Sequence, residues 1–178
     1  MQTTPRFATA ALALAAMICC GPAQAGIFTF AGDTSGAPTF HRAVEDFSSL
    51  SSVGVANPYQ VTEIAVSVTG SYSFLTTSGG HDAFTFLYSS FNPANATANG
   101  IIANDDLLGL TTSGFSASLT AGVSYFFVST GFAPTDFGSY STTIGGPGLA
   151  AVVPEPATYA LMLAGVAGLA AWSRRRRA

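Results

Sequence analysis

The 178-residue sequence has no lysine and few charged residues of any kind. Charged side chains make up 8% of the chain and hydrophobic ones 48%, whereas a soluble globular domain is about a quarter charged. This composition excludes disorder driven by charge, which needs low hydrophobicity and high net charge. It also excludes a nucleic-acid-binding protein of the usual kind, because five of the six arginines are Arg6 and the run 174–177 and so form no basic face on the body.

The first 25 residues have the features of a secretory signal peptide. Arg6 supplies the positive start, residues 7–20 form an apolar stretch, and Ala23-Gln24-Ala25 is a small-x-small cleavage signal. We therefore expect residues 1–25 to form a signal helix, which signal peptidase removes by cutting between Ala25 and Gly26.

Both cysteines of the chain, Cys19 and Cys20, lie inside this segment, so the exported chain would contain none. That excludes disulfides, a thiolate nucleophile and a cysteine-ligated metal. The sequence also lacks a His-Glu-x-x-His zinc motif and a Gly-x-Ser-x-Gly nucleophile elbow, and its glycine-rich stretches lack the lysine of a phosphate loop. We expect no enzymatic activity.

Residues 153–178 have three parts in a fixed order. A Pro-Glu-Pro triplet comes first, then the uncharged apolar stretch 157–172, then an arginine cluster. Sixteen apolar residues are near the short limit for crossing the hydrocarbon core, where about 17–25 are usual, and the arginines would stay in the cytoplasm. The residues of this signal are Val153, Pro154, Glu155, Pro156, Arg174, Arg175, Arg176 and Arg177.

This tail resembles the PEP-CTERM sorting signal of Gram-negative bacteria. The resemblance implies export across the inner membrane, a transient anchor through residues 157–172, and processing near the triplet by an exosortase-type membrane enzyme. The protein would then reach the cell surface or the exterior, often in bacteria that make exopolysaccharide. A plain permanent C-terminal anchor is the alternative.

The body of the chain, residues 26–152, is acidic and rich in hydroxyl groups. It has one base, Arg42, and eight acidic residues, so its net charge is −7. Serine and threonine make up about a quarter of it. Such a domain would attract cations and be steered away from phosphate polymers.

Apolar periodicity predicts an all-β, antiparallel sandwich or barrel of six to eight strands. The segment 123–130 is the most apolar, so it should be a central strand with Phe126, Phe127 or both fully buried. Only residues 42–50 could form a short helix. The predicted strands are 59–68 (with Ile64, Val66 and Val68 on one face), 72–77, 83–88, 115–119, 123–130 and 138–144. The last of them, 138–144, should close the domain before the glycine-rich segment 145–148.

Five segments of the body together resemble a family: 80–88, 91–93, 99–106, 119–125 and 138–140. They are similar to an uncharacterised group of exported bacterial proteins often marked by a Phe-Asp-Pro motif, itself distantly similar to bacterial pre-peptidase C-terminal domains. This chain has Asn92 where that group usually has aspartate. The resemblance implies a jelly-roll-like sandwich with an accessory, non-catalytic role.

One cluster of oxygen ligands stands out: Asn104, Asp105 and Asp106, with Asp82 as a further member. Calcium takes six to eight oxygen ligands at about 2.3–2.6 Å, and adjacent carboxylates with backbone carbonyls can supply them. The alternative is that these residues form Asx-turns or cap backbone groups between strands.

Together these features indicate an exported interaction or structural protein of the envelope or extracellular matrix, linked to exopolysaccharide or biofilm. The alternative function is a calcium-dependent glycan-binding or adhesin module. The expected partners are signal peptidase, an exosortase-type enzyme, exopolysaccharide, and the membrane before processing, but not nucleic acid.

Overall fold

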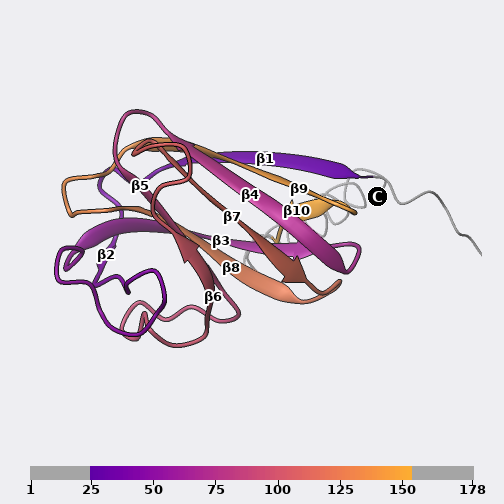
Figure 1. Cartoon of the computed structure of the whole chain (residues 1–178), viewed down its shortest axis with the longest axis horizontal. Helices are drawn as coiled ribbons and strands as arrows, with labels where there is room; N and C mark the ends of the chain where they lie inside the picture. Colours follow the sequence, from indigo (N-terminus) through magenta and orange to yellow (C-terminus); the bar gives the residue numbers. More distant parts are fainter. Residues whose placement is uncertain (1–24, 154–178) are drawn as a thin grey trace, which may run out of the picture.

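The computed structural model describes residues 25–153, which form strands and no helix (Figure 1). The strands are β1 (Gly26–Asp33), β2 (Thr39–Phe40), β3 (Asn57–Val66), β4 (Gly70–Ser78), β5 (Ala83–Tyr88), β6 (Gly100–Asn104), β7 (Thr112–Leu119), β8 (Ser124–Gly131), β9 (Ser139–Gly146) and β10 (Ala150–Val152). The expected signal-peptide helix and membrane-spanning stretch lie outside this range. Within it, no helix is long and apolar enough to cross a membrane.

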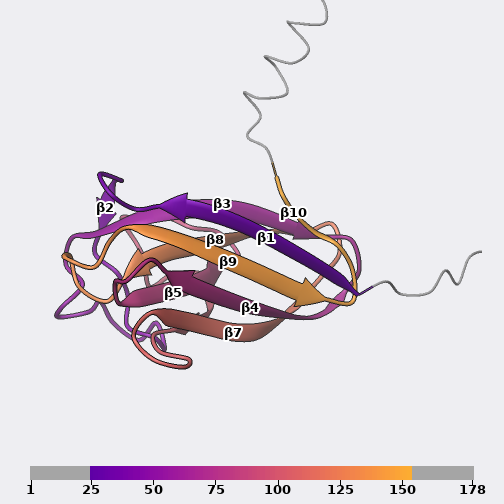
Figure 2. The same ribbon diagram turned by 90° about the horizontal axis from the view of Figure 1, so that it is seen from above.

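The strands form two antiparallel sheets that face each other (Figure 2). One sheet has the order β1-β9-β4-β7, and the other has the order β10-β3-β8-β5-β6, with β2 added beside β3. Along the chain, consecutive strands alternate between the sheets except at β2–β3 and β5–β6, which is jelly-roll topology. The prediction of an antiparallel, jelly-roll-like sandwich is confirmed.

The main core lies between the two sheets, around Phe127 of β8. Its ring is fully buried and is 5.8 Å from the rings of both Phe30 and Phe74, centroid to centroid. β8 pairs with β3 on one side and β5 on the other. The prediction of a central strand here is confirmed, because a strand covered on both faces needs few polar residues.

A second core lies on the outer face of the larger sheet. Phe84, Phe86 and Tyr88 of β5 point to this face, where Phe40 of β2 covers them together with Phe47 and Phe91 from the flanking loops. All six residues of β5 are buried as a result. The chain between β2 and β3 and the chain between β5 and β6 therefore serve as a lid on the sandwich.

The structure corrects three local predictions. Residues 42–50 form a turn closed by a bridge between Ala43 and Leu50, not a helix. Phe47 adopts a φ of 59° there, and its ring packs on Phe86 and Tyr88, so tertiary packing overrides helix propensity. Val68 lies beyond the end of β3 and is exposed, not on the buried face.

The third correction concerns the end of the domain. The predicted strand 138–144, which is β9, does not close the sandwich, since β10 follows the glycine-rich segment and pairs with β3. β1, β2 and β6 were likewise not among the predicted strands, so the described residues have ten strands where six to eight were expected. Phe28 and Phe30 do alternate with exposed residues along β1. β10 has only three residues, and apolar periodicity cannot be recognised in a strand of that length.

Candidate functional site

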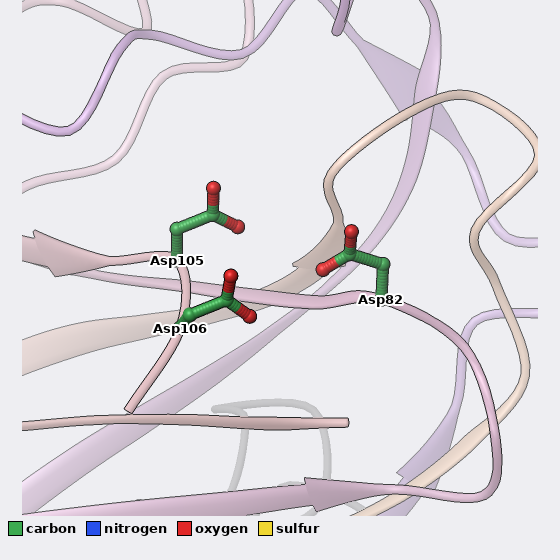
Figure 3. A group of neighbouring side chains, drawn as sticks. All are labelled: Asp82, Asp105 and Asp106. Atoms are coloured by element: carbon green, nitrogen blue, oxygen red, sulfur yellow. The ribbon is translucent and has the colours of Figure 1, made fainter. Parts of the chain in front are cut away.

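Three of the four predicted ligand residues meet at one end of the sandwich. Asp82 immediately precedes β5, and Asp105 and Asp106 immediately follow β6. Because β5 and β6 pair with Thr85 opposite Asn104, these ends lie side by side. One carboxylate oxygen of each aspartate lies within 4.8 Å of the others, with Asp82 facing the other two across the gap between the segments (Figure 3).

The carboxylates of this cluster, Asp82, Asp105 and Asp106, lack protein partners where they are buried. Oδ1 of Asp82 and Oδ1 of Asp105 are both buried without a hydrogen bond. Burial, then the charges of Asp82 and Asp106, raise the pKa of Asp105 to about 6. Burial and Asp106 also raise the pKa of Asp82. The ionised cluster is therefore unfavourable by itself, and a bound cation would relieve it.

Arg42 is the nearby base, but its hydrogen bonds go to the backbone. Its Nε donates to the carbonyl of Phe132 at 3.0 Å and its Nη1 to that of Ala43 at 3.1 Å. The guanidinium lies over the Phe84 ring at 4.3 Å. Burial lowers the pKa of Arg42, while Asp105 and Asp82 oppose that shift from a distance. The positive charge of Arg42 thus favours the ionised form of Asp82 and Asp105. Its hydrogen bonds, however, go to backbone carbonyls and not to the carboxylate oxygens.

Asn104 has a structural role as well. Its Oδ1 accepts a hydrogen bond from the Gly114 N–H at 2.8 Å, and its Nδ2 donates to Glu45 at 3.4 Å. The first contact joins β6 to β7, ten residues along the chain, so Asn104 caps a backbone group between strands, as one of the alternatives above expects, and does not form a local Asx-turn through this contact. Asn104 therefore braces the loop that presents Asp105 and Asp106.

Two further acidic residues contribute to the field around the cluster. Glu45 raises the pKa of Asp105, and Asp136 raises that of Asp82. They come from separate loops, β2–β3 and β8–β9, and no local motif in the sequence connects either with Asp82 or Asp105. Several carboxylates at one end of a domain with net charge −7 are suited to a hard divalent cation.

A second surface with a distinct chemistry is the outer face of the sheet β1-β9-β4-β7. These four strands contain one charged residue, Asp33. Their outward side chains are mostly hydroxyls, and neighbouring strands join them in pairs: Thr29 with Thr143 at 3.0 Å, and Ser73 with Ser116 at 2.9 Å. We call this surface the hydroxyl face; its members are Thr29, Ser71, Ser73, Thr77, Ser116, Ser118, Ser141 and Thr143.

The two expected processing sites border the folded body directly. β1 begins at Gly26, the residue that would follow the signal-peptidase cut. At the other end, the Val153 N–H donates to the Glu63 carbonyl at 2.9 Å. The remaining residues of the sorting signal, from Pro154 to Arg177, lie outside the described residues. The sandwich thus occupies the whole chain between the two signals.

The tail agrees with a known signal. Residues 152–177 match the PEP-CTERM protein-sorting motif. The chain is therefore an exported protein that is anchored through its C-terminal region in the membrane of a Gram-negative envelope and then processed by an exosortase-type enzyme. The sequence-based identification of the tail is confirmed.

The body is distantly similar to several solved structures. No curated protein is significantly similar to the chain in sequence. Among solved structures, the periplasmic g-type lysozyme inhibitor PliG of Aeromonas hydrophila is 11% identical with a TM-score of 0.36, over 67% of this chain and 83% of that one.

Two adhesin domains of the Lys-gingipain of Porphyromonas gingivalis, K3 and K1, are each 14% identical. K3 has a TM-score of 0.33 over 66% of this chain and 74% of that one, and K1 has 0.34 over 68% and 96%. All these TM-scores are too low to assign a role to this chain. The resemblance of the body to the Phe-Asp-Pro group stays a prediction.

Proposed function

We propose that this exported protein is a non-catalytic interaction protein of the cell surface or extracellular matrix, and that its hydroxyl face contacts neutral polysaccharide. The observation that carries the proposal is the near absence of charge on the strands β1, β4, β7 and β9 in a domain of net charge −7. A neutral polymer meets no electrostatic barrier on this face. The sorting motif supports the proposal, because it marks the chain for export to the envelope.

The chemistry of the hydroxyl face suits sugar hydroxyls. Each serine or threonine hydroxyl has one donor and two acceptor positions, so the pairs Thr29–Thr143 and Ser73–Ser116 keep further capacity that points to solvent. The strand register holds these groups in rows, with Ser73 opposite Ser116 and Thr29 opposite Thr143. A fixed array loses little side-chain entropy on binding.

Co-sedimentation of the secreted protein with microcrystalline cellulose, and its retardation by a soluble neutral β-glucan, test this function. The variant with Ser73→Glu and Ser116→Glu places two carboxylates on the hydroxyl face. Its matched control, Ser52→Glu with Ser90→Glu, adds the same charge at exposed positions in the two lid loops. We expect the wild type and the control to bind and the face variant to lose binding. Equal binding by all three, or none by the wild type, would contradict the proposal.

A second candidate function is a calcium-dependent adhesin. It is favoured by one specific observation, the convergence of Asp82, Asp105 and Asp106 with two buried carboxylate oxygens that have no protein partner. In this proposal a calcium ion binds Asp82, before β5, together with Asp105 and Asp106, after β6. The ion thereby restrains the loop after Asp106. Extracellular calcium sites with dissociation constants of about 10⁻⁴–10⁻³ M are functional.

Thermal unfolding in excess calcium and in chelator tests this site. At a hundredfold excess over its dissociation constant, the ion would add about 2.7 kcal/mol of stability, a rise of several degrees in Tm. Asp105→Asn with Asp106→Asn should abolish the rise. Asp33→Asn with Asp46→Asn removes the same charge at two exposed positions outside the cluster and should preserve the rise.

The alternative interpretation, in which these residues only satisfy backbone groups between strands, predicts a different pattern. If the cluster has only a structural role, calcium leaves the wild-type Tm unchanged while Asn104→Ala lowers it, because the Gly114 N–H and Glu45 lose their partner. That pattern would remove the metal site and leave the first proposal standing.

A further inference from the structure

The end of the sandwich opposite the carboxylate cluster is a surface made by strand ends and loops without any charged side chain. Gly26, the loop 67–69, the loop 120–123 and the segment 147–149 meet there. The Ser67 N–H donates to the Leu149 carbonyl, the Ala121 N–H to Thr69 Oγ1, and the Gly122 N–H to the Val66 carbonyl. Figure 1 shows the start of β1 beside the end of β9 at the right-hand end of the molecule.

Large apolar side chains are exposed on and beside this end. The exposed fractions are 79% for Ile27, 66% for Leu149, 42% for Val123, and 40% each for Val68 and Val152. We call these five residues the tail-side surface. Single exposed apolar residues are common on soluble proteins. A group of them, carried by loops that have no charged side chain, indicates a contact surface.

The path of the chain limits how far this surface can be from the membrane. The fold holds the chain up to Val153, through its hydrogen bond to the Glu63 carbonyl, and the apolar stretch begins at residue 157. An extended chain covers at most about 3.6 Å per residue, so the connection spans roughly 14 Å or less. The headgroup region on one side of a bilayer is itself about 5–8 Å thick.

We propose that the tail-side surface lies in the headgroup region of the lipid bilayer while the chain is anchored, which rests on the proposed span at residues 157–172. Apolar side chains without neighbouring charges can enter this region favourably. The opposite end, with Asp82, Asp105 and Asp106, then faces away from the membrane. This orientation also keeps the acidic end away from anionic lipids, which would repel it.

The test uses the chain from Gly26 to Ala178, which is the expected form after signal-peptidase cleavage and before removal of the tail, in vesicles of phosphatidylethanolamine and phosphatidylglycerol. Because the body has no cysteine, Leu149→Cys, Val123→Cys and the control Leu108→Cys each give one labelling site for an environment-sensitive fluorophore. Leu108 is 84% exposed and follows the carboxylate cluster at the other end. We expect blue-shifted emission and several-fold stronger quenching by headgroup-nitroxide lipid at Leu149 and Val123, with neither at Leu108.

Flotation of the same samples separates the possible failures. If the chain floats with the vesicles but all three labels behave alike, the anchor stands and the proposed contact is wrong. If the chain does not float, the proposed span is wrong and the contact falls with it. Blue shifts at Leu149 and Val123 that appear only at high protein density in the vesicles indicate a second copy as the occupant, which would also overturn the proposal.

Discussion

Arg42 shows how one residue organises the acidic end of the molecule. It is the only lysine or arginine between residues 25 and 153, and it is 3% exposed. Its guanidinium lies between the rings of Phe84 and Phe132, and its stem fills the space at Gly54, where a Cβ would overlap it. Since its donors go to backbone carbonyls, Asp82 and Asp105 keep unpartnered oxygens.

The raised pKa of Asp105 predicts that this carboxyl group lowers the stability of the metal-free protein as the pH rises. Its pKa is about 6 in the folded protein, from an ordinary value of 3.8. Below about pH 4 both states hold the proton; between about pH 4 and 6 the unfolded state releases it first, so the free energy of unfolding falls, and above about pH 6 the whole loss is present. Urea denaturation in chelator from pH 4 to 7 measures this effect.

The informative quantity is the difference between the wild type and Asp105→Asn. Asp33 and Asp46 have pKa values lowered by hydrogen bonds from Ser35 and Ser48, so they contribute in the opposite direction in both proteins. We expect Asp105→Asn to gain stability relative to the wild type as the pH rises through this window. A constant difference at every pH would contradict the prediction.

At the scale of the element, the strands buried on both faces were the most predictable from the sequence. β5 and β8 have nearly continuous apolar runs because each face of each strand meets a core, the inter-sheet core on one side and the lid on the other. β1 and β10 pair at sheet edges, and β10 has only three residues, so their patterns are weak. The turn at 42–50 depends on Phe47 reaching Phe86 and Tyr88, a contact that no local pattern contains.

The same limit applies to the candidate site. Asp105 and Asp106 are adjacent in sequence, and Asp82 precedes a strand that pairs with theirs, so the cluster could be predicted. Glu45 and Asp136, from two other loops, raise the pKa values of Asp105 and Asp82. Asn104 accepts a hydrogen bond from the Gly114 N–H, which belongs to the other sheet. These contacts follow from tertiary structure, which a single sequence does not display.

Phe127 is the residue of β8 on which the inter-sheet core depends most. It is fully buried and its ring meets Phe30, Phe74 and Phe115. Truncation of a buried phenylalanine to alanine costs about 3–5 kcal/mol, a large part of a typical stability of about 5–15 kcal/mol. We expect this loss for Phe127→Ala in urea denaturation.

Phe126, one residue earlier, gives the matched comparison. It points to the other face of β8 and is only partly buried beside the lid. Phe126→Ala should therefore cost clearly less than Phe127→Ala. Equal losses would show that the lid contributes as much to stability as the space between the sheets.

At the scale of the whole molecule, charge and polarity are separated between surfaces. The carboxylate cluster occupies one end, the uncharged tail-side surface the other, and the hydroxyl face covers the outside of one sheet. The chain enters β1 at Gly26 and leaves β10 beside Glu63, both on the tail-side half. A protein held at that half presents its acidic end and most of its hydroxyl face to the exterior.

This arrangement predicts that removal of the tail leaves the sandwich intact. The pairing of β10 with β3 ends at Val152, and the last backbone hydrogen bond to β3 is made by Val153, so a cut at the triplet removes no strand. We expect the intact mass of the secreted species to match a chain that starts at Gly26 and ends near Pro154–Pro156.

Replacing Pro154, Glu155 and Pro156 by alanine should leave the protein in the inner membrane, with the body as stable as before. Pro93→Ala, an exposed proline in a lid loop, should be processed normally. A secreted species that still contains Arg174–Arg177 would show instead that the arginine cluster and the apolar stretch before it stay with the mature protein, as a permanent anchor requires.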